Sequence, residues 1–353
     1  MLYFLGSFFP LLRYQTFRGV CAVLLSFAIS WLCGEYFIKF LKAQQKSGQP
    51  IRDDGPQHHI TQKAGTPTMG GLLILWSVTL TTLLLSNLSI VYVWLVLFVM
   101  WAYGSIGLLD DLRKLKNNNN YQGVSVRQKF MLQFGIGGLV ALIIGWLIGS
   151  SVHFPLLKNF VVELPLFLFV IWGAVVIVGS TNAVNLTDGL DGLAIFPVMM
   201  ASFSLAAIAY VVGHAVFSKY LLLPHVPNMG ELVVFLGAWM GGSLGFLWYN
   251  APPARIFMGD TGSLAAGASL GATALLIKHE FVWALIGAIF VVEALSVIIQ
   301  VFYYKRTKKR IFLMAPLHHH FEQKGMQEST IVIRFWIMAV LLSVIGLASL
   351  KLR

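Results

Sequence analysis

The chain has 353 residues, of which 58% are hydrophobic and only 11% are charged, and its formal net charge is +11. A water-soluble protein of this length needs far more polar surface, so the composition excludes an ordinary soluble enzyme. The two cysteines, Cys21 and Cys33, fall in one apolar segment, so neither a disulfide framework nor a cysteine-based metal site is indicated.

Apolar stretches close to the roughly 20 residues needed to cross a bilayer recur along the whole chain. They are continuous and rich in Leu, Ile, Val, Phe and Gly, which is typical of packed membrane helices and not of a transmembrane β-barrel. The sequence therefore predicts an all-α polytopic membrane protein in which residues 1–353 form a single domain. The ten expected transmembrane helices lie at about residues 20–40, 68–86, 91–109, 130–149, 164–181, 190–212, 232–249, 262–277, 281–302 and 331–350.

The Lys and Arg residues predict which way these helices cross the membrane. When the loops are counted in order, the odd-numbered loops and their helix ends hold 18 of the 25 basic residues and all seven aspartates. The positive-inside rule then puts the odd loops in the cytoplasm and both termini on the opposite side. Arg13 and Arg18, ahead of the first helix, argue mildly for the reverse. The loops expected to carry the chemistry lie at about residues 41–67, 110–128, 182–191, 250–261 and 303–330.

Asp110 and Asp111 follow an apolar helix at the start of one of these loops. Two adjacent carboxylates repel each other unless a cation lies near them. A bound metal ion would meet that need. A solvated helix end, in which Lys114 and Lys116 accompany the carboxylates, would meet it equally well. The motif alone leaves both interpretations open.

Four polar residues at a spacing of three, Asn182, Asn185, Asp188 and Asp191, interrupt an otherwise apolar stretch. If the segment is helical, they form one polar stripe. A glycine follows each aspartate and lets the backbone approach a ligand closely. Capping of a helix by Asp188 is the alternative interpretation, but it does not account for all four residues.

Asp260 lies just before a helix that we expect to start at Gly262. It could cap that helix, or it could be a hard oxygen ligand for Mg²⁺ while the first amides of the helix bind a phosphate. Phe257, three residues earlier, could stack on a base or anchor the loop in the membrane interface.

His318, His319 and His320 are consecutive, so their side chains point in different directions and do not form a compact zinc site. Contact with a phosphate or acid–base work suits them better, and a plain surface tract is the alternative. Glu35 and Glu293 fall inside apolar helices, where ionisable residues are usually functional or paired. The sequence assigns neither glutamate a role.

Three acidic clusters in separate loops are therefore expected on one face, with the histidines and with Lys63 beside a Gly-rich turn. This set fits metal-dependent phosphoryl transfer, in which metal ions neutralise charge and other groups position the phosphates. The apolar surroundings suggest that one substrate is a lipid phosphate.

Five motifs, in order GTPTMGG, GLLDDL, NAVNLTDGLDG, FMGDTGS and APLHHHFE, carry a family resemblance. The chain resembles the bacterial phospho-N-acetylmuramoyl-pentapeptide transferases, within the polyprenyl-phosphate N-acetylhexosamine-1-phosphate transferase superfamily. The Asp-Asp and Gly-Asp elements resemble the whole superfamily, whereas the triple histidine and the first motif resemble this branch. The motifs lie at residues 65–71, 107–112, 182–192, 257–263 and 315–322, and the ten-helix pattern covers nearly the whole chain.

The resemblance implies that UDP-N-acetylmuramoyl-pentapeptide and undecaprenyl phosphate give lipid I and UMP with Mg²⁺, in the first membrane step of peptidoglycan synthesis. It also implies a multi-pass protein of the bacterial inner membrane, a site that faces the cytoplasm and a homodimer, and no nucleic-acid partner is expected. Carried onto this chain, it makes Asp260 the best Mg²⁺ ligand, and it gives Asp110 and Asp111 a part in metal binding or in activating the lipid phosphate. His318 would be catalytic. The expected substrate-binding residues are Lys63, Thr68, Lys114, Asn182, Asn185, Asp188, Asp191, Asn250, Phe257, Gln300, His319 and His320.

The sequence leaves the mechanism and two rival functions open. We favour direct in-line attack by the lipid phosphate, which is already anionic and needs orientation more than deprotonation, although Asp110 could act as a base. A two-step route through a phospho-aspartate at Asp111 is the alternative. The chain could instead transfer N-acetylglucosamine-1-phosphate. It could also be a transporter, although transporter sites usually lie near the bilayer midplane and these acids lie at helix ends.

Overall fold

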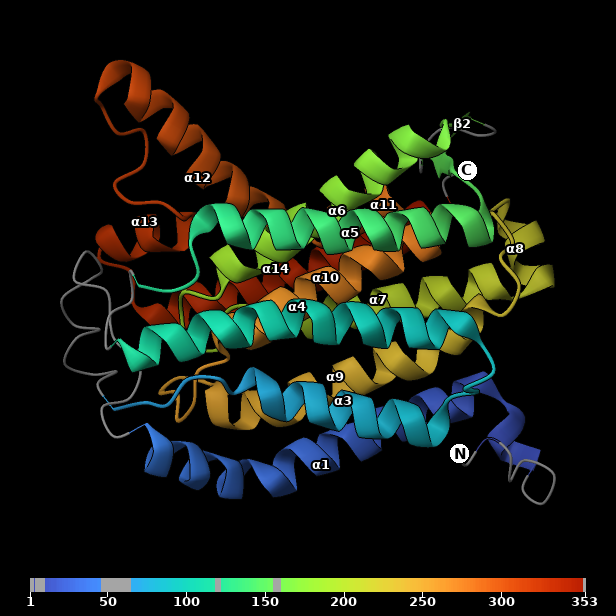
Figure 1. Ribbon diagram of the computed structural model, residues 1–353, viewed down its shortest axis with the longest axis horizontal. Helices are drawn as coiled ribbons and strands as arrows, with labels where there is room; N and C mark the ends of the chain where they lie inside the picture. Colours follow the sequence, from blue (N-terminus) through green and yellow to red (C-terminus); the bar gives the residue numbers. More distant parts are fainter. Residues whose placement is uncertain (1–2, 4–9, 46–64, 118–121, 155–159, 352–353) are drawn as a thin grey trace.

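The computed structural model describes residue 3 and residues 10–45, 65–117, 122–154 and 160–351. These residues form a bundle of long helices, and the strands β1 (Ser151–His153) and β2 (Val161–Glu163) form a small antiparallel sheet (Figure 1). The long helices are α1 (Gln15–Gln44), α3 (Gly71–Leu85), α4 (Val91–Lys116), α5 (Val126–Ile148), α6 (Leu166–Thr187), α7 (Ile195–Gly213), α9 (Leu232–Asn250), α10 (Gly259–Leu276), α12 (Ala288–Thr307) and α14 (Glu328–Ser349). Shorter helices are η2 (Pro10–Arg13), α8 (Ala215–Leu221), η3 (Met229–Glu231), α11 (Glu280–Ile286) and α13 (Leu317–Gln323).

The predicted fold class, an all-α polytopic membrane protein, is confirmed. Each of the ten predicted segments contains a helix, and eight helices in the described part of the chain are long and apolar enough to cross a membrane. The other two are α3, with 15 residues, and α10, with 18 residues rich in Gly, Ala and Ser. The side of the membrane on which the termini lie stays a prediction.

Helix α10 forms the centre of the bundle. Every residue from Thr261 to Leu276 is buried, and the helix packs against α4, α6 and α3. Its small residues allow close approach: a Cβ added to Gly267 would lie 2.5 Å from the carbonyl oxygen of Ser180. Because protein surrounds α10 on all sides, its residues are chosen for helix–helix contact rather than for hydrophobicity. The N-terminus of this central helix carries Asp260.

Several helices begin or end at other residues than predicted, and these differences place the site residues. Helix α10 begins at Gly259, so Asp260 lies in its first turn and not before the helix. Helix α4 continues to Lys116, so Asp110 and Asp111 belong to a helix whose charged end extends beyond its apolar part. Helix α6 ends at Thr187, so Asp188 and Asp191 lie in the following turns and the predicted single stripe stops at Asn185.

The predicted segment 281–302 is divided at Gly287 into α11 and α12. A Cβ at Gly287 would lie 3.1 Å from the ring and from the carbonyl oxygen of Trp283, so a side chain at this break would be crowded. Beyond the break, α12 diverges from the bundle at the upper left of Figure 1, and every residue from 301 to 310 is exposed.

A buried ion pair connects the start of α1, η3 and the end of α3. Arg18 in α1 donates to both carboxylate oxygens of Glu231 and to the carbonyl oxygen of Leu85 at 2.9 Å, while Glu231 also accepts from the backbone N of Asn87 at 2.6 Å. Arg18 is therefore a paired internal residue of α1, and its charge carries little information about membrane orientation.

Candidate active site

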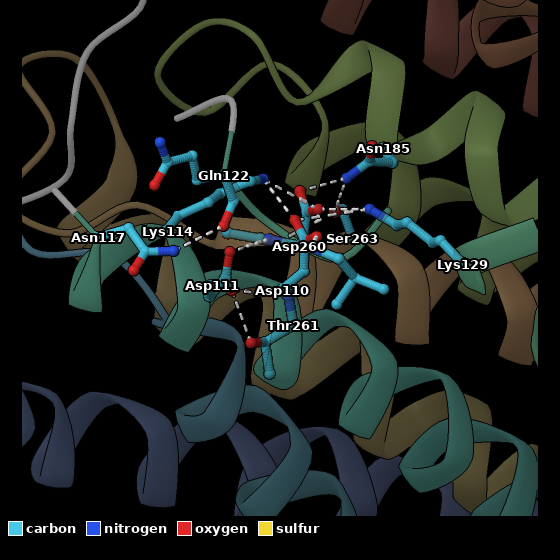
Figure 2. Close-up of polar contacts among 12 residues, drawn as sticks. Asp110, Asp111, Lys114, Asn117, Gln122, Lys129, Asn185, Asp260, Thr261 and Ser263 are labelled. Carbon is cyan, nitrogen blue, oxygen red and sulfur yellow. Dashed lines mark hydrogen bonds and ion pairs between the residues drawn. The ribbon is translucent and has the colours of Figure 1, made fainter. Parts of the chain in front are cut away.

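Asp260, in the first turn of α10, is bound by side chains from three other helical segments (Figure 2). Asn185 Nδ2, near the end of α6, donates to Asp260 Oδ1 at 2.8 Å and to Ser263 Oγ at 2.8 Å. Lys129 Nζ, in the first turn of α5, lies 2.6 Å from Asp260 Oδ2, and Lys114 Nζ, in α4, lies 3.3 Å from it. The ends of α4, α5, α6 and α10 thus meet at one carboxylate.

Asp110 and Asp111 are adjacent in sequence but have different partners, because consecutive residues of an α-helix point about 100° apart. Asp110 Oδ2 lies 2.6 Å from Lys114 Nζ and 3.8 Å from Lys129 Nζ, and Asp110 Oδ1 accepts from the backbone N of Val124 at 2.7 Å. Asp110 therefore holds the loop before α5 and shares both lysines with Asp260.

Asp111 instead binds the start of α10. Its carboxylate accepts from the backbone N of Asp260 at 3.2 Å, the backbone N of Thr261 at 3.0 Å and Thr261 Oγ1 at 2.7 Å. The sequence allowed Asp260 to be the cap of this helix, and the structure shows that Asp111 satisfies its first amides from outside. Asp111 thereby fixes the backbone that carries Asp260.

Two glycines allow this close contact between segments. Gly259 has φ +72°, and a Cβ there would lie 2.7 Å from Asp111 Oδ2 and 2.7 Å from Thr68 Oγ1. A Cβ on Gly107 would lie 2.2 Å from the carbonyl oxygen of Asp260. A side chain at either position would separate α4 from the start of α10. Gly107 is the glycine of the GLLDDL motif, and Gly259 is the first glycine of FMGDTGS.

Thr68 and Phe257 lie on two chain segments that hydrogen-bond to each other beside Asp260. The backbone N of Phe257 donates to the carbonyl oxygen of Pro67 at 2.9 Å. The backbone N of Gly70 donates to the carbonyl oxygen of Phe257 at 2.8 Å. Thr68 is buried, its backbone N and O both bind the Gln45 amide, and the Phe257 side chain is half-buried. The first and fourth sequence motifs therefore form one wall of the site.

The charges of the cluster determine the ionisation of Asp260, which lies ahead of the predicted membrane segment 262–277. Burial raises the pKa of its carboxyl group, but Lys129 and Lys114 outweigh this effect, so the pKa lies well below its ordinary value. Asp260 is therefore an ionised carboxylate at neutral pH.

The side chains of the cluster are compatible with Mg²⁺ at Asp110 and Asp260. Both carboxylates supply hard oxygens, and the Lys129 ammonium group lies between them, so the site accommodates a positive charge there. Within the described ranges, no group of three or more His, Cys, Asp or Glu side chains is arranged to hold a metal ion. A magnesium ion would therefore need water and substrate oxygens as further ligands, and the assignment of Asp110, Asp111 and Asp260 as metal ligands stays a prediction.

Asp191 and Asn250, both predicted to bind substrate, are buried and bind backbone. Asp191 Oδ2 accepts from the backbone N of Ala254 at 2.9 Å. Asn250 Oδ1 accepts from the backbone N of Gly192 at 3.1 Å, and Asn250 Nδ2 donates to the carbonyl oxygen of Ile256 at 2.8 Å. These side chains connect the turn after α6 to the loop before α10, so their observed contacts support the shape of the site.

Asn182 and Gln300 also use their amides within the fold. Asn182 Nδ2 donates to Gln133 Oε1 and to the carbonyl oxygen of Val178, both at 2.8 Å. Gln300 binds the backbone of Ile311 and Phe312 through its oxygen and nitrogen, and so fixes the chain that leaves α12. Asp188 directly follows α6 and is half-buried.

The three histidines have three different surroundings. His318 is fully buried: its backbone N donates to Glu293 Oε1 at 3.1 Å, and its Nδ1 lies 3.1 Å from Glu293 Oε2. His319 Nδ1 lies 2.5 Å from Glu322 Oε2. His320 Nδ1 accepts from the backbone N of Leu313, which requires a lone pair, and burial followed by the charge of Lys324 lowers the pKa of His320 accordingly.

His318 is connected to the Asp260 cluster through the end of α6. A Cβ added to Gly189 would lie 2.3 Å from His318 Nε2, so the imidazole rests against this residue. Asn185, one helical turn earlier, holds Asp260. The triple-histidine helix α13 and the carboxylate cluster therefore both contact the chain segment 185–189.

Two further residues named from the sequence have another outcome. Lys63 lies outside the described residues. Glu35 is only partly buried and pairs with Arg255 at 2.7 Å, whereas Glu293 is completely buried and pairs with His318, so both glutamates are paired.

Lys129 and Thr261 are the main site residues that sequence reasoning did not select. Lys129 was counted only among the basic residues that orient the membrane helices. Its available signal was a position in the first turn of a helix that follows the Asp-Asp loop. Thr261 directly follows Asp260, and its hydroxyl and amide both bind Asp111.

Comparison with known proteins defines the class. Residues 93–278 match the model of glycosyl transferase family 4, and residues 63–75 match the phospho-N-acetylmuramoyl-pentapeptide-transferase signature 1. The fold and the matched models together define a membrane-embedded glycosyl transferase of family 4. The first match covers the segments that contribute Asp110, Asn185 and Asp260.

Three relatives match nearly end to end, and each is named phospho-N-acetylmuramoyl-pentapeptide-transferase. The protein from Dinoroseobacter shibae is 53% identical over 352 residues, which are 99% of this chain and 97% of the relative. Those from Granulibacter bethesdensis and Caulobacter sp. are 52% and 51% identical, covering 98% and 97% of this chain and 96% and 94% of the relatives. The chain belongs to the phospho-N-acetylmuramoyl-pentapeptide-transferase family, which confirms the resemblance seen in its motifs.

Proposed function

We propose that this protein transfers phospho-N-acetylmuramoyl-pentapeptide from its UDP-activated form to undecaprenyl phosphate, giving lipid I and UMP, with Mg²⁺ as cofactor. The observation that carries the proposal is the cluster of Asp110, Asp260, Lys114 and Lys129 at the meeting point of four membrane helices. Phosphoryl transfer depends mainly on positioning and charge neutralisation, and this cluster offers cations for phosphates beside carboxylates for a metal ion.

In the reaction, an oxygen of the lipid phosphate attacks the β-phosphorus of the nucleotide sugar. The bond from that phosphorus to the oxygen bridging the two phosphates breaks, and UMP leaves with the bonding electrons. The attacking oxygen is already anionic, so orientation matters more than deprotonation. Lys114 and Lys129 bind phosphate oxygens. Asp260 and Asp110 would hold Mg²⁺, which would supply positive charge for the departing UMP.

The contacts of Asp111 favour this one-step route over a phospho-aspartate at that residue. Its carboxylate accepts three hydrogen bonds from Asp260 and Thr261. Attack by Asp111 would require it to release the start of α10, which carries Asp260. Asp110 shares both lysines and is better placed as a base for any lipid phosphate that retains a proton.

We also propose a location in the bacterial inner membrane with the site facing the cytoplasm, supported by the basic residues at the helix ends beside the site. The family resemblance alone supports a homodimer.

The side of the membrane that the site faces is tested with Lys309→Cys in a chain whose Cys21 and Cys33 are replaced by Ala. A membrane-impermeant thiol reagent should label inverted vesicles and leave intact spheroplasts unlabelled, and the opposite pattern would reverse the orientation.

The reaction is tested by measuring UMP release from detergent-purified protein supplied with UDP-N-acetylmuramoyl-pentapeptide and undecaprenyl phosphate. Release should require the lipid and Mg²⁺ and should stop on addition of a chelator. Preferential use of UDP-N-acetylglucosamine would instead assign the other sugar. Absence of release from a folded preparation, together with solute uptake by proteoliposomes, would support the transporter.

A further inference from the structure

Glu293 is a completely buried acid in α12, and the mechanism above does not use it. Both of its oxygens accept from one residue, because the backbone N of His318 lies 3.1 Å from Oε1 and the imidazole Nδ1 lies 3.1 Å from Oε2. Within the described part of the chain, no lysine or arginine forms a salt bridge with this carboxylate. A buried carboxylate that serves a single imidazole has the geometry of a positioning group.

The carboxylate determines which nitrogen of His318 faces away from Glu293. With Nδ1–H donated to Glu293, the Nε2 atom carries the lone pair, or carries a second proton when the ring becomes a cation that the carboxylate stabilises. The same logic operates where a carboxylate orients a catalytic or metal-binding histidine. Glu293 therefore gives His318 one tautomer and one direction.

The second ring nitrogen, Nε2, lacks a hydrogen-bond partner and faces the turn after α6. Nε2 of His318 is buried and has no hydrogen-bond partner among the described residues. A Cβ on Gly189 would lie 2.3 Å from it, so only glycine leaves this face of the ring uncovered by a side chain. A buried polar atom without a partner is unfavourable and calls for a functional explanation. Binding of a ligand at this turn would supply the missing partner.

We propose that Glu293 is a positioning residue of the transferase, which holds His318 with Nε2 directed at the Asp188–Gly189 turn to contact a phosphate oxygen of the nucleotide sugar. This inference rests on the proposed function, because it needs that turn to border the nucleotide-sugar pocket. Glu293, the single glutamate of α12, thereby acts through a histidine that lies 25 residues further along the chain.

A structural role must be separated from this one, because Glu293 also binds the backbone N of His318 at the start of α13. Two substitutions at His318 separate the roles. In His318→Asn the amide nitrogen takes the place of Nδ1, so the bond to Glu293 remains and Nε2 is lost. In His318→Gln the amide reaches the place of Nε2, and the bond to Glu293 is weakened. Glu293→Gln keeps the shape but turns an N–H toward a donor.

The experiment is steady-state UMP release by full-length protein with undecaprenyl phosphate, Mg²⁺ and varied UDP-N-acetylmuramoyl-pentapeptide. Glu293→Gln should lower kcat/KM by about tenfold or more, and His318→Asn by about a hundredfold, as expected for a lost hydrogen bond to a charged group. His318→Gln should retain more activity than His318→Asn. Glu163→Gln, an exposed charge removal on β2, is the matched control and should behave as wild type.

The double variant Glu293→Gln/His318→Asn decides the inference. If Glu293 acts through Nε2 of His318, adding Glu293→Gln to His318→Asn should cause little further loss. A full additional loss, or greater activity in His318→Asn than in His318→Gln, would mean that Glu293 only holds α13, and it would overturn the proposal. These outcomes require an active wild type, so a wild type that releases no UMP contradicts the proposed function itself.

Discussion

Two clusters lie at the two ends of α3, and each combines basic and acidic side chains. They use the same chemical groups in different ways. At Leu85, the last residue of the helix, Arg18 and Glu231 form a closed pair with 1% and 2% of their side chains exposed. At Gly71, the first residue, the helix touches the start of α10 beside the Asp260 cluster. There two lysines share two carboxylates, and the side chains of Lys114, Lys129 and Asp260 are 16–17% exposed.

The difference shows how an ion pair that supports the fold differs from one that prepares for a ligand. In the first cluster the Arg18 guanidinium and the Glu231 carboxylate meet through two hydrogen bonds, and the carbonyl oxygen of Leu85 and the backbone N of Asn87 bind them as well. In the second cluster Lys129 bridges two carboxylates at unequal distances of 2.6 and 3.8 Å, so neither pairing is complete. A shared and partly exposed cation can exchange a carboxylate for a phosphate oxygen with little loss.

The largest expected effect is on turnover, from a change in the open cluster. Asp260→Asn should reduce UMP release by about a thousandfold or more, because it removes the proposed Mg²⁺ ligand and one of the two carboxylates that both lysines share. The melting temperature in detergent should stay near that of wild type, since asparagine keeps the shape and an acceptor oxygen for Asn185. Near-normal rates at saturating Mg²⁺ would contradict the assignment.

The next effect is on stability, from a change in the closed pair. Arg18→Met should lower the free energy of unfolding by about 3–5 kcal/mol, because it leaves Glu231 buried without its partner. Arg18→Met/Glu231→Gln should recover most of that loss, and the turnover per folded molecule should not change. Thermal unfolding in detergent and active-site titration measure the two quantities. A large fall in turnover at unchanged stability would show that the closed pair also serves the reaction.

A smaller effect is expected from removing one shared lysine. Lys129→Met should reduce kcat/KM for the nucleotide sugar by about tenfold to a hundredfold, as expected for the loss of a charge-assisted hydrogen bond to phosphate. Arg127→Met, two residues earlier on the same helix, is the matched control because its side chain is exposed. Equal losses in the two variants would indicate a general effect of positive charge rather than a specific contact.

The sequence predicted the helices and the convergence of the acidic motifs, because both depend on signals that are local in the chain. Long apolar runs define the membrane helices whatever their neighbours are. The partners within the site depend on where helices end in space. Asp110 and Asp111 are distinguished only because α4 continues to Lys116 and places one carboxylate against α10. Glu293 and His318 are 25 residues apart, and nothing in either local pattern indicated that they pair.

The smallest effect sharpens the comparison inside the open cluster, where Asp111 resembles the closed pair more than its neighbour does. Asp111→Asn keeps one acceptor for Thr261 but turns an N–H toward a donor, so the free energy of unfolding should fall by about 1 kcal/mol, as for a lost helix cap. Asp110→Asn leaves those amides bound and should not lower the melting temperature. Turnover should fall in both variants, because Asp111 fixes the backbone of Asp260. Unchanged stability in Asp111→Asn, with a raised Mg²⁺ requirement, would instead make this carboxylate a metal ligand.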